Sequence, residues 1–390
     1  MLQDYFADMH IHIGRDIFDK PVKITASKNL TITTILKEAS RNKGIHLIGV
    51  IDCQSPAVQL ELKQLIDKGE AIELADGGIR FEDVTLLLGS EIEVYDEHCQ
   101  GPIHVLCYLP SLAQMEQFSE WLVTKMKNIT LSSQRYYGSA KELQYKVKEL
   151  SGIFIPAHVF TPYKSLYGKG VHHSLEEVFD PDLIDGIELG LSADTFMADQ
   201  ISELHTFTYL TNSDAHSLAK IGREYQQVLM EEPSFKEFTY VLHQIDGRRI
   251  IRNFGMNPKL GKYHKTVCDD CHSYMEVNAL ACANCGSRKI VKGVADRIAE
   301  IADQKERIQT RPSYQYQVPL EYLPKLGPKT FQKLMDHFQT EMAIIHHASY
   351  DSLRKIVPEQ IAKSIIQMRE GKLTINAGGG GKYGTVSALE

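Results

Sequence analysis

The chain has 390 residues, of which 43% are hydrophobic and 24% are charged. This composition is ordinary for folded, soluble protein, and the length allows two or three domains. No apolar run reaches the length of a membrane span and the first residues do not resemble a secretion signal, so we expect a cytoplasmic protein with no membrane partner. The net charge of -7 does not suggest a nucleic-acid partner. Residues 251–390, however, hold 20 Lys and Arg against 14 Asp and Glu, and this basic part could meet a polyanion.

The first part of the chain, residues 1–255, alternates short β-type runs with helical patterns. Strands are predicted at Tyr5–His10, Leu47–Ile51, Leu86–Glu91, His104–Tyr108, Gly152–Ala157, Gly186–Leu189 and Thr208–Asn212. Helices are predicted at Thr33–Lys43, Ala57–Lys68, Leu112–Lys127 and Ala140–Leu150. Strands that alternate with helices over this length predict an α/β barrel or a close variant.

Residue types that bind metal ions recur at the ends of the predicted strands. They are His10, His12, Glu91, His104, His158, Asp214 and His216. The ends of parallel strands gather on one face of a sheet, so these side chains should meet. Imidazole and carboxylate together suit zinc, manganese or iron, and two or three such ions usually serve the hydrolysis of a phosphate ester. One such histidine alone would more often cap a strand, but the recurrence of the pattern favours a metal centre.

Residues Asp8, His10 and His12 share the parity of one extended segment and therefore one face. Both imidazoles can reach one site, and Asp8 could bind metal or orient a ligand imidazole through a hydrogen bond. Ser213, beside Asp214, lacks a recognisable base, which disfavours a covalent nucleophile there. The pattern therefore favours hydrolysis by a metal-activated water, for which Asp214, His216 and Glu91 are the catalytic candidates.

Four cysteines form two pairs of knuckle spacing in residues 256–292. They are Cys268, Cys271, Cys282 and Cys285, and ten residues separate the two pairs. This spacing allows four thiolates to bind one structural zinc ion, which would supply most of the folding energy of so short a segment. Lysine and arginine residues flank the pairs, so a surface that faces nucleic acid is plausible.

Residues 293–376 are expected to form a small helical domain. It begins with a charged helix from Gly293 to about Arg307. The run Leu323–Leu334 then predicts a helix, a tight turn at Gly327 and a second helix. Such a hairpin resembles the helix-hairpin-helix of DNA repair proteins, in which turn amides face a phosphate, and Lys329 and Lys333 would add positive charge. A degenerate second copy follows at Ser352–Ile361, and the glycine-rich end, residues 377–390, predicts a flexible tail.

The metal-ligand set resembles that of the PHP superfamily, named after polymerase and histidinol phosphatase. The resemblance implies a distorted (β/α)7 barrel over residues 1–255 that binds about three divalent ions, with zinc expected and manganese or magnesium as alternatives. It implies that the seven residues of the set are ligands. Two departures exist. Asp52-Cys53 stands where the family often has Asp-His, so Asp52 or Cys53 is the candidate ligand. No further histidine follows His12 closely, and Asp16 or Asp19 could substitute.

The order of barrel, zinc module and hairpin-type region is similar to the endonuclease Q family of DNA repair enzymes. This resemblance implies cleavage of DNA on the 5′ side of uracil, hypoxanthine, xanthine or an abasic site. Damaged double-stranded or single-stranded DNA is then the partner. Candidate DNA-binding or lesion-pocket residues are Lys28, Tyr163, Lys164, Lys169, Arg223, Gly327, Lys329 and Lys333. Two alternatives remain: a small-molecule phosphatase of the histidinol phosphatase type, and a DNA-binding protein without catalysis.

Overall fold

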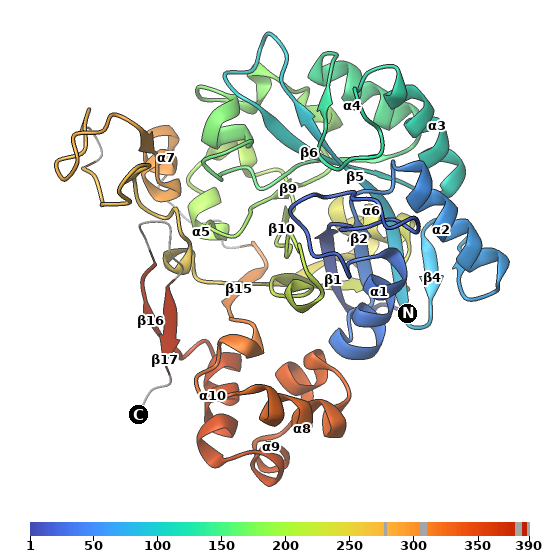
Figure 1. Ribbon diagram of the computed structural model, residues 1–390, viewed down its shortest axis with the longest axis vertical. Helices are drawn as coiled ribbons and strands as arrows, with labels where there is room; N and C mark the ends of the chain where they lie inside the picture. The colour runs from blue at the N-terminus through green and yellow to red at the C-terminus, as the bar shows by residue number, and fades with distance from the viewer. Residues whose placement is uncertain (277–278, 305–309, 379–383, 388–390) are drawn as a thin grey trace.

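A mixed sheet of eleven strands forms the centre of this computed structural model, which describes residues 1–276, 279–304, 310–378 and 384–387. The seven strands predicted from the sequence are all present, and most of them are labelled in Figure 1. They are β1 (Gln3–Ile11), β2 (Leu47–Val50), β5 (Val84–Val94), β6 (Ile103–Leu109), β8 (Ile153–Pro156), β9 (Ile187–Glu188) and β10 (Tyr209–Leu210). The prediction of an α/β class is therefore correct.

The strands are not all parallel, which differs from the expectation for a simple barrel. Strands β1, β2 and β5 pair in parallel, but β6 runs antiparallel to both β5 and β8. Strands β9 and β10 pair in parallel with each other. Backbone hydrogen bonds link Val159, after β8, to Glu188 in β9, and link Ala215, after β10, to His10 and His12. Neighbouring segments are thus hydrogen-bonded all the way round from β1 back to β1.

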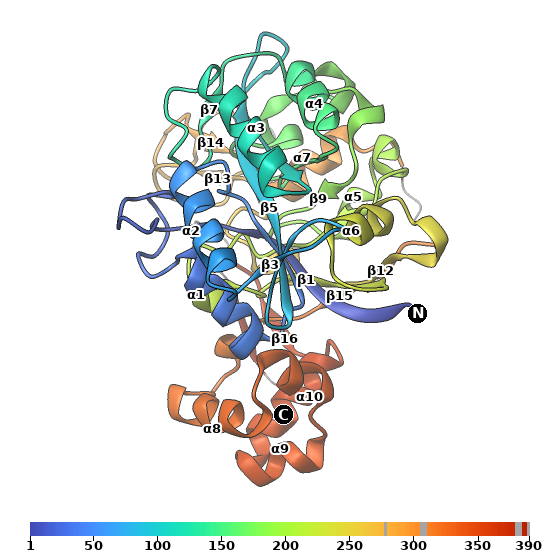
Figure 2. The same cartoon turned by 90° about the vertical axis from the view of Figure 1, so that its right-hand side faces the viewer.

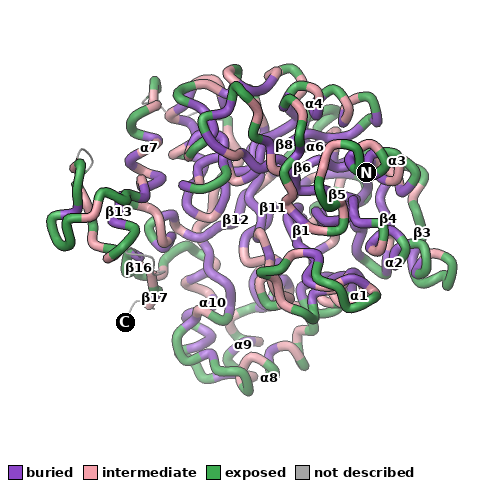
Figure 3. The backbone as a smooth tube through the Cα atoms, turned by 45° about the horizontal axis from the view of Figure 1, so that its top comes forward, coloured by how far each residue is buried: buried purple, intermediate pink, exposed green. Residues whose placement is uncertain are grey.

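Two further strands extend the sheet beyond β1. They are β11 (Tyr225–Met230) and β12 (Arg249–Gly255), both in antiparallel pairs. A hairpin of β3 (Ile72–Glu73) and β4 (Ile79–Phe81) lies at the other edge, and the short β7 (Arg135–Tyr136) pairs with β5. Apolar side chains of β11 and of six strands in the closed series from β1 to β10 pack into one buried cluster. This cluster includes Met9, Leu87, Leu106, Ile155 and Leu210. Burial along the central strands, in contrast to the exposed outer loops, is visible in Figure 3.

The predicted helices of the first domain cover the outside of this sheet (Figure 2). They are α1 (Ile32–Lys37), α2 (Pro56–Asp67), α3 (Leu112–Val123) and α4 (Ala140–Glu149), to which the structure adds α5 (Thr195–Ala198) and α6 (Phe235–Leu242). Helix α1 continues as a π-helical turn over Glu38–Lys43. Serine side chains at 111 and 139 cap α3 and α4 by accepting backbone N–H bonds, which explains where these helices begin.

The remaining segments form two smaller units beside the barrel-like part. The cysteine module contains β13 (Val267–Cys268) and β14 (Ile290–Val291), and α7 (Val294–Ile301) follows it. The chain then returns to the main sheet as β15 (Ser313–Tyr316), which pairs with β12. Helices α8 (Pro328–Phe338), α9 (Tyr350–Ile356) and α10 (Glu359–Arg369) form a separate lobe at the bottom of Figure 1. No helix in the described ranges is long and apolar enough to cross a membrane.

Three sequence expectations for the C-terminal part differ from the structure. Helix α7 ends at Ile301, and the end of the predicted helix, from residue 305 onward, lies outside the described part. Only a 3-10 turn, Leu320–Tyr322, precedes the turn at Gly327, so no α-helix forms the first arm of the predicted hairpin. Thr385–Ser387, in the expected flexible tail, form β17, which pairs with β16 (Thr374–Asn376), while residues 379–383 and 388–390 are outside the described part.

Candidate metal centre and its pocket

His10 and His12 lie side by side near the end of β1, each held by a carboxylate. The Nδ1 atom of His10 lies 2.9 Å from Glu188 Oε1, and that of His12 lies 3.2 Å from Asp52 Oδ2. The opposite Nε2 atoms are buried and have no hydrogen-bond partner in the described structure. A carboxylate on one ring nitrogen that leaves the other nitrogen unpartnered is the usual arrangement of a metal-ligating histidine.

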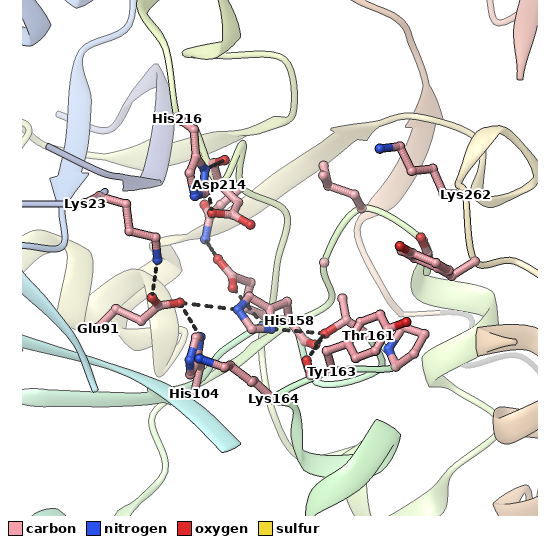
Figure 4. Close-up of a pocket in the computed structure, with 17 residues that line it drawn as sticks. Lys23, Glu91, His104, His158, Thr161, Tyr163, Lys164, Asp214, His216 and Lys262 are labelled. Atoms are coloured by element: carbon pink, nitrogen blue, oxygen red, sulfur yellow. Dashed lines mark hydrogen bonds and ion pairs between the residues drawn. The ribbon is translucent and has the colours of Figure 1, made fainter. Parts of the chain in front are cut away.

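Glu91, in β5, lies at the centre of the ligand set. Its Oε1 atom is 2.8 Å from His104 Nδ1, 3.3 Å from His158 Nε2 and 3.6 Å from His10 Nε2. Its Oε2 atom is 3.7 Å from His12 Nε2. His104 opens the antiparallel strand β6, so the start of this strand meets the same edge as the ends of its parallel neighbours. One carboxylate therefore faces four histidines, and its contacts with His104 and His158 are drawn in Figure 4.

Asp214 faces His10 and His12 from the loop after β10. Its Oδ1 atom lies 3.5 Å from the Nε2 atoms of both histidines. The backbone of Asp214 is in the left-handed region, at φ 45°, and that of His158 is at φ 31°. Such conformations are uncommon for residues other than glycine and concentrate at functional sites, where the surroundings enforce them.

The donors form two groups of three, each compact enough to hold one metal ion. The first contains His10, His12 and Asp214, and the second contains Glu91, His104 and His158. Burial raises the pKa of the Glu91 carboxyl, but the charges of His104 and Lys23 outweigh it and hold that pKa well below its usual value. Burial lowers the pKa of His10, whereas the nearby carboxylates, Glu188 first among them, raise it to about 10. The residues thus fit divalent cations by donor type and by charge.

Three predicted site residues stand outside these two groups. Asp52 accepts a 2.7 Å hydrogen bond from the backbone N–H of Ile13 and orients His12, so it supports a ligand from behind. His216 stacks near His12, with ring centroids 4.6 Å apart, and its Nδ1 lies 3.0 Å from the Asp214 carbonyl oxygen. Asp8 orients no imidazole.

Asp8 instead holds the loop that carries Asp214. Its Oδ1 atom accepts from the backbone N–H of Ser213, and its Oδ2 atom accepts from that of Gly222. Arg223 contributes to the same loop, because its guanidinium donates to the carbonyl oxygens of Ser213 and Asp214. Arg223 therefore has a structural role here in addition to any contact with DNA.

Two functional residues were missed in the sequence. Glu188 accepts hydrogen bonds from His10, from the side chain of Asn212 and from the backbone of His158. Glu188 lies near the end of a predicted strand, and a carboxylate at such a position is the signal that could have identified it. Lys23, from the loop after β1, lies 3.2 Å from Glu91 Oε2 and 2.6 Å from Ser133 Oγ. No local pattern distinguishes it from the other lysines of that loop.

A pocket of about 300 Å³ is lined by several of the candidate metal ligands. Tyr163 and Tyr263 form part of its wall, with ring centroids 5.6 Å apart and planes at 81°. Lys164 and Lys262 also line it (Figure 4). Lys164 pairs with Glu93 at 2.9 Å. Residues 262 and 263 lead into the cysteine module, so this module helps to build the pocket.

The other predicted DNA-contact residues lie away from this pocket. Lys28 is exposed on the loop after β1, and Lys169 ends a π-helical turn. Gly327 caps α8 at φ -78°, and the left-handed residue of that turn is Lys325, at φ 68°. Lys329 and Lys333 are exposed on α8.

The four cysteines of the module come together as predicted. The Sγ atoms of Cys268 and Cys285 are 3.6 Å apart, and those of Cys271 and Cys282 are 3.5 Å apart. All four thiols form one group of potential ligands. Hydrogen bonds from Ser273 lower the pKa of Cys271 to about 5, which favours the thiolate form that binds zinc.

The chain is similar to known proteins over its whole length. No family model matches it. It is 53% identical over 385 residues to the uncharacterized protein YqxK of Bacillus subtilis (strain 168), covering 99% of this chain and 100% of that protein. Its fold matches the crystal structure of the lesion-specific endonuclease PfuEndoQ from Pyrococcus furiosus with a TM-score of 0.86 and 32% identity, covering 100% of this chain and 96% of the other.

A second solved structure is similar over the same length. It is a complex of endonuclease Q with a 27-mer duplex substrate that has an abasic lesion at the active site. The TM-score is 0.85 and the identity 31%, with coverage of 100% and 97%. Because these matches extend over every unit of the fold at more than 30% identity, the chain belongs to the endonuclease Q family.

Proposed function

We propose that this protein is a metal-dependent endonuclease that cuts DNA at damaged nucleotides. The observation that carries the proposal is the conjunction of two features. The whole chain matches a structure of endonuclease Q with lesion-containing duplex DNA, and members of two compact groups of potential ligands line a pocket. A phosphatase for small molecules would need the barrel alone and would leave the cysteine module and the helical lobe without a function.

The detailed fold, the substrates and the position of the cut are proposed from membership of the endonuclease Q family. The fold is proposed as a PHP-type distorted (β/α)7 barrel with a four-cysteine zinc module and a helical DNA-binding domain. The proposed substrates are uracil, hypoxanthine, xanthine and abasic sites, with cleavage on the 5′ side of the lesion. Metal ions held by the two groups of potential ligands would neutralise the charge of the phosphodiester and would lower the pKa of a bound water molecule.

The chain's own residues would prepare this chemistry. Glu188 and Asp52 fix the rings of His10 and His12, so that both Nε2 atoms face one point. The left-handed backbone at Asp214 directs its carboxylate to the same point. Rings that are fixed before substrate arrives require little reorganisation in the transition state, which lowers the barrier.

The pocket would receive a nucleotide taken out of the base stack. Enzymes that act on damaged bases commonly extrude the nucleotide and inspect it between aromatic side chains. Tyr163 and Tyr263 supply such surfaces, and Lys164 and Lys262 place positive charge beside the phosphate path. The cysteine module would thereby contribute to lesion recognition through the segment that leads into it.

The variant Asp214→Asn tests the proposal. It removes one ligand charge and retains the shape of the side chain, so we expect cleavage to fall by more than roughly 100-fold, because loss of a mere supporting group already costs 10–100-fold. Binding to a lesion-containing duplex should persist. Asp19→Asn is the matched control, since that carboxylate is 89% exposed and lies outside the site. Cleavage by Asp214→Asn within twofold of the control would remove Asp214 from the centre.

A further inference from the structure

Lys23 lies inside the candidate metal centre, at a place where a third ion would be expected. It comes from the loop after β1, and the backbone of that loop is fixed, because Lys23 N–H donates to Ile13 O and Val22 O accepts from Ser132 N–H. The ammonium group lies 3.2 Å from Glu91 Oε2 and 2.6 Å from Ser133 Oγ, and the side chain is only 16% exposed. Figure 4 shows it pointing at Glu91 from the side of Asp214 and His216.

The residues that could replace the missing ligands of a third ion have other functions. The Cys53 thiol is buried and donates to Val50 O at 3.2 Å. Asp16 Oδ1 accepts from the backbone N–H groups of Phe18 and Lys20, both at 2.9 Å. Asp19 points into solvent beside Arg15.

Asp52 joins neither ligand group: its Oδ2 atom is bonded to His12 and to Ile13 N–H, and its buried Oδ1 atom has no hydrogen-bond partner in the described structure. Among the ligands expected for such a site, His216 lines the pocket but belongs to neither of the two ligand groups. In the described ranges, the barrel residues form two groups of ligands and no third.

We infer that the ε-ammonium group of Lys23 takes the place of a third metal ion, so that the centre holds two ions and one built-in cation. Glu91 is the shared element: its two oxygens face the histidines of both groups, and its Oε2 atom also accepts from Lys23. A divalent ion on this side of Glu91 would stand a few ångströms from a buried ammonium, and at that distance two positive charges repel strongly.

The presence of Lys23 in place of a third ion changes how the metal centre obtains its positive charge. A lysine supplies one positive charge that does not depend on metal supply, and it lines the pocket where an anionic substrate would enter. Lys23 is therefore a positioning residue that fixes the carboxylate of Glu91. This inference rests on the proposed metal centre, not on the nature of the substrate.

Native mass spectrometry of the full-length protein, combined with elemental analysis, tests the inference by counting ions. The wild-type protein, saturated with zinc or manganese, should carry two ions in the barrel and one in the cysteine module. The variant Lys23→His places an imidazole beside His216 and Glu91 and should gain one ion. Lys28→His is the matched control, because it changes an exposed lysine of the same loop and should leave the count unchanged.

Three ions in the wild-type barrel would overturn the inference, as would a Lys23→His variant that folds and gains no ion at saturating metal. If Lys23→His does not fold, the wild-type count alone decides. Failure of this inference is distinct from failure of the proposed function, because a protein with three barrel ions could still cut damaged DNA. Conversely, a protein with two ions that cuts no lesion would refute only the proposed function.

Discussion

Two buried carboxylates, Glu188 and Asp52, hold the imidazole rings of His10 and His12 in the candidate metal centre. The alternation of β1 places His10 and His12 on one face, and Glu91, His104 and His158 join them. The sequence does not show that Asp52 and Glu188 support these ligands from behind, because a carboxylate that binds metal and one that binds an imidazole have the same residue type. Lys23 was missed because its position depends on how an irregular loop folds.

Glu224 is a buried acid outside the metal centre. Its Oε1 atom accepts from Met256 N–H at 2.8 Å, and Oε2 has no partner in the described structure. Burial raises the pKa of this carboxyl to about 8, so the folded protein keeps a proton that the unfolded chain releases above its ordinary pKa of 4.5. The contribution of Glu224 to stability is therefore complete below pH 4.5 and is lost as the pH rises through about 8.

The variant Glu224→Gln should remove this loss, because an amide cannot ionise and can still accept from Met256. We expect its free energy of unfolding to exceed that of the wild-type protein at pH 8 and to approach it near pH 5. Urea unfolding across this range measures the difference. The matched control is Glu231→Gln, which changes an exposed acid and should leave the pH dependence of unfolding unchanged. Gln226→Glu is not suitable as a control, because the Gln226 side chain both accepts and donates a hydrogen bond. A difference that is constant with pH would contradict the assigned titration.

At the scale of elements, the predicted strands and helices of the first domain are present, but their directions are not visible in local patterns. His104 reaches the site because β6 is antiparallel to β5, whereas the sequence suggested parallel strands throughout. The hairpin prediction failed in its first arm, because hydrophobic spacing cannot distinguish a 3-10 turn from a helix over so few residues. The cysteine module was predicted well, since four thiols at knuckle spacing specify one arrangement.

The cysteine module should be coupled to the pocket through residues 262 and 263. Cys282→Ser should release one zinc ion, leave the barrel ions in place, and increase hydrogen exchange over residues 262–276, because zinc supplies the folding energy of this segment. Affinity for a lesion-containing duplex should then decrease. Cys99→Ser is the control, since its thiol donates to Asp96, a bond that a hydroxyl can keep. Loss of all ions together, or of none, would show that the two sites are not separate.

At the scale of the whole molecule, the structure explains how three units work as one. Strand β15 returns from the cysteine module to pair with β12. The helical lobe is fixed to the first domain by a 2.6 Å contact between Tyr225 and His346 and by a buried ion pair between Lys43 and Glu341, also 2.6 Å. The sequence predicted the order of these units and their charge asymmetry. It could not predict these contacts, which join residues more than a hundred positions apart.

Cleavage of DNA beside a damaged nucleotide by the whole protein can be measured directly. End-labelled duplexes of one sequence, with uracil, hypoxanthine, an abasic site or no lesion, are incubated with the wild-type protein and a divalent metal, and the products are mapped on a sequencing gel. We expect a single cut on the 5′ side of each lesion and none in the intact duplex. Equal cutting of the intact duplex, or no cutting of any duplex by fully metallated protein, would contradict this expectation.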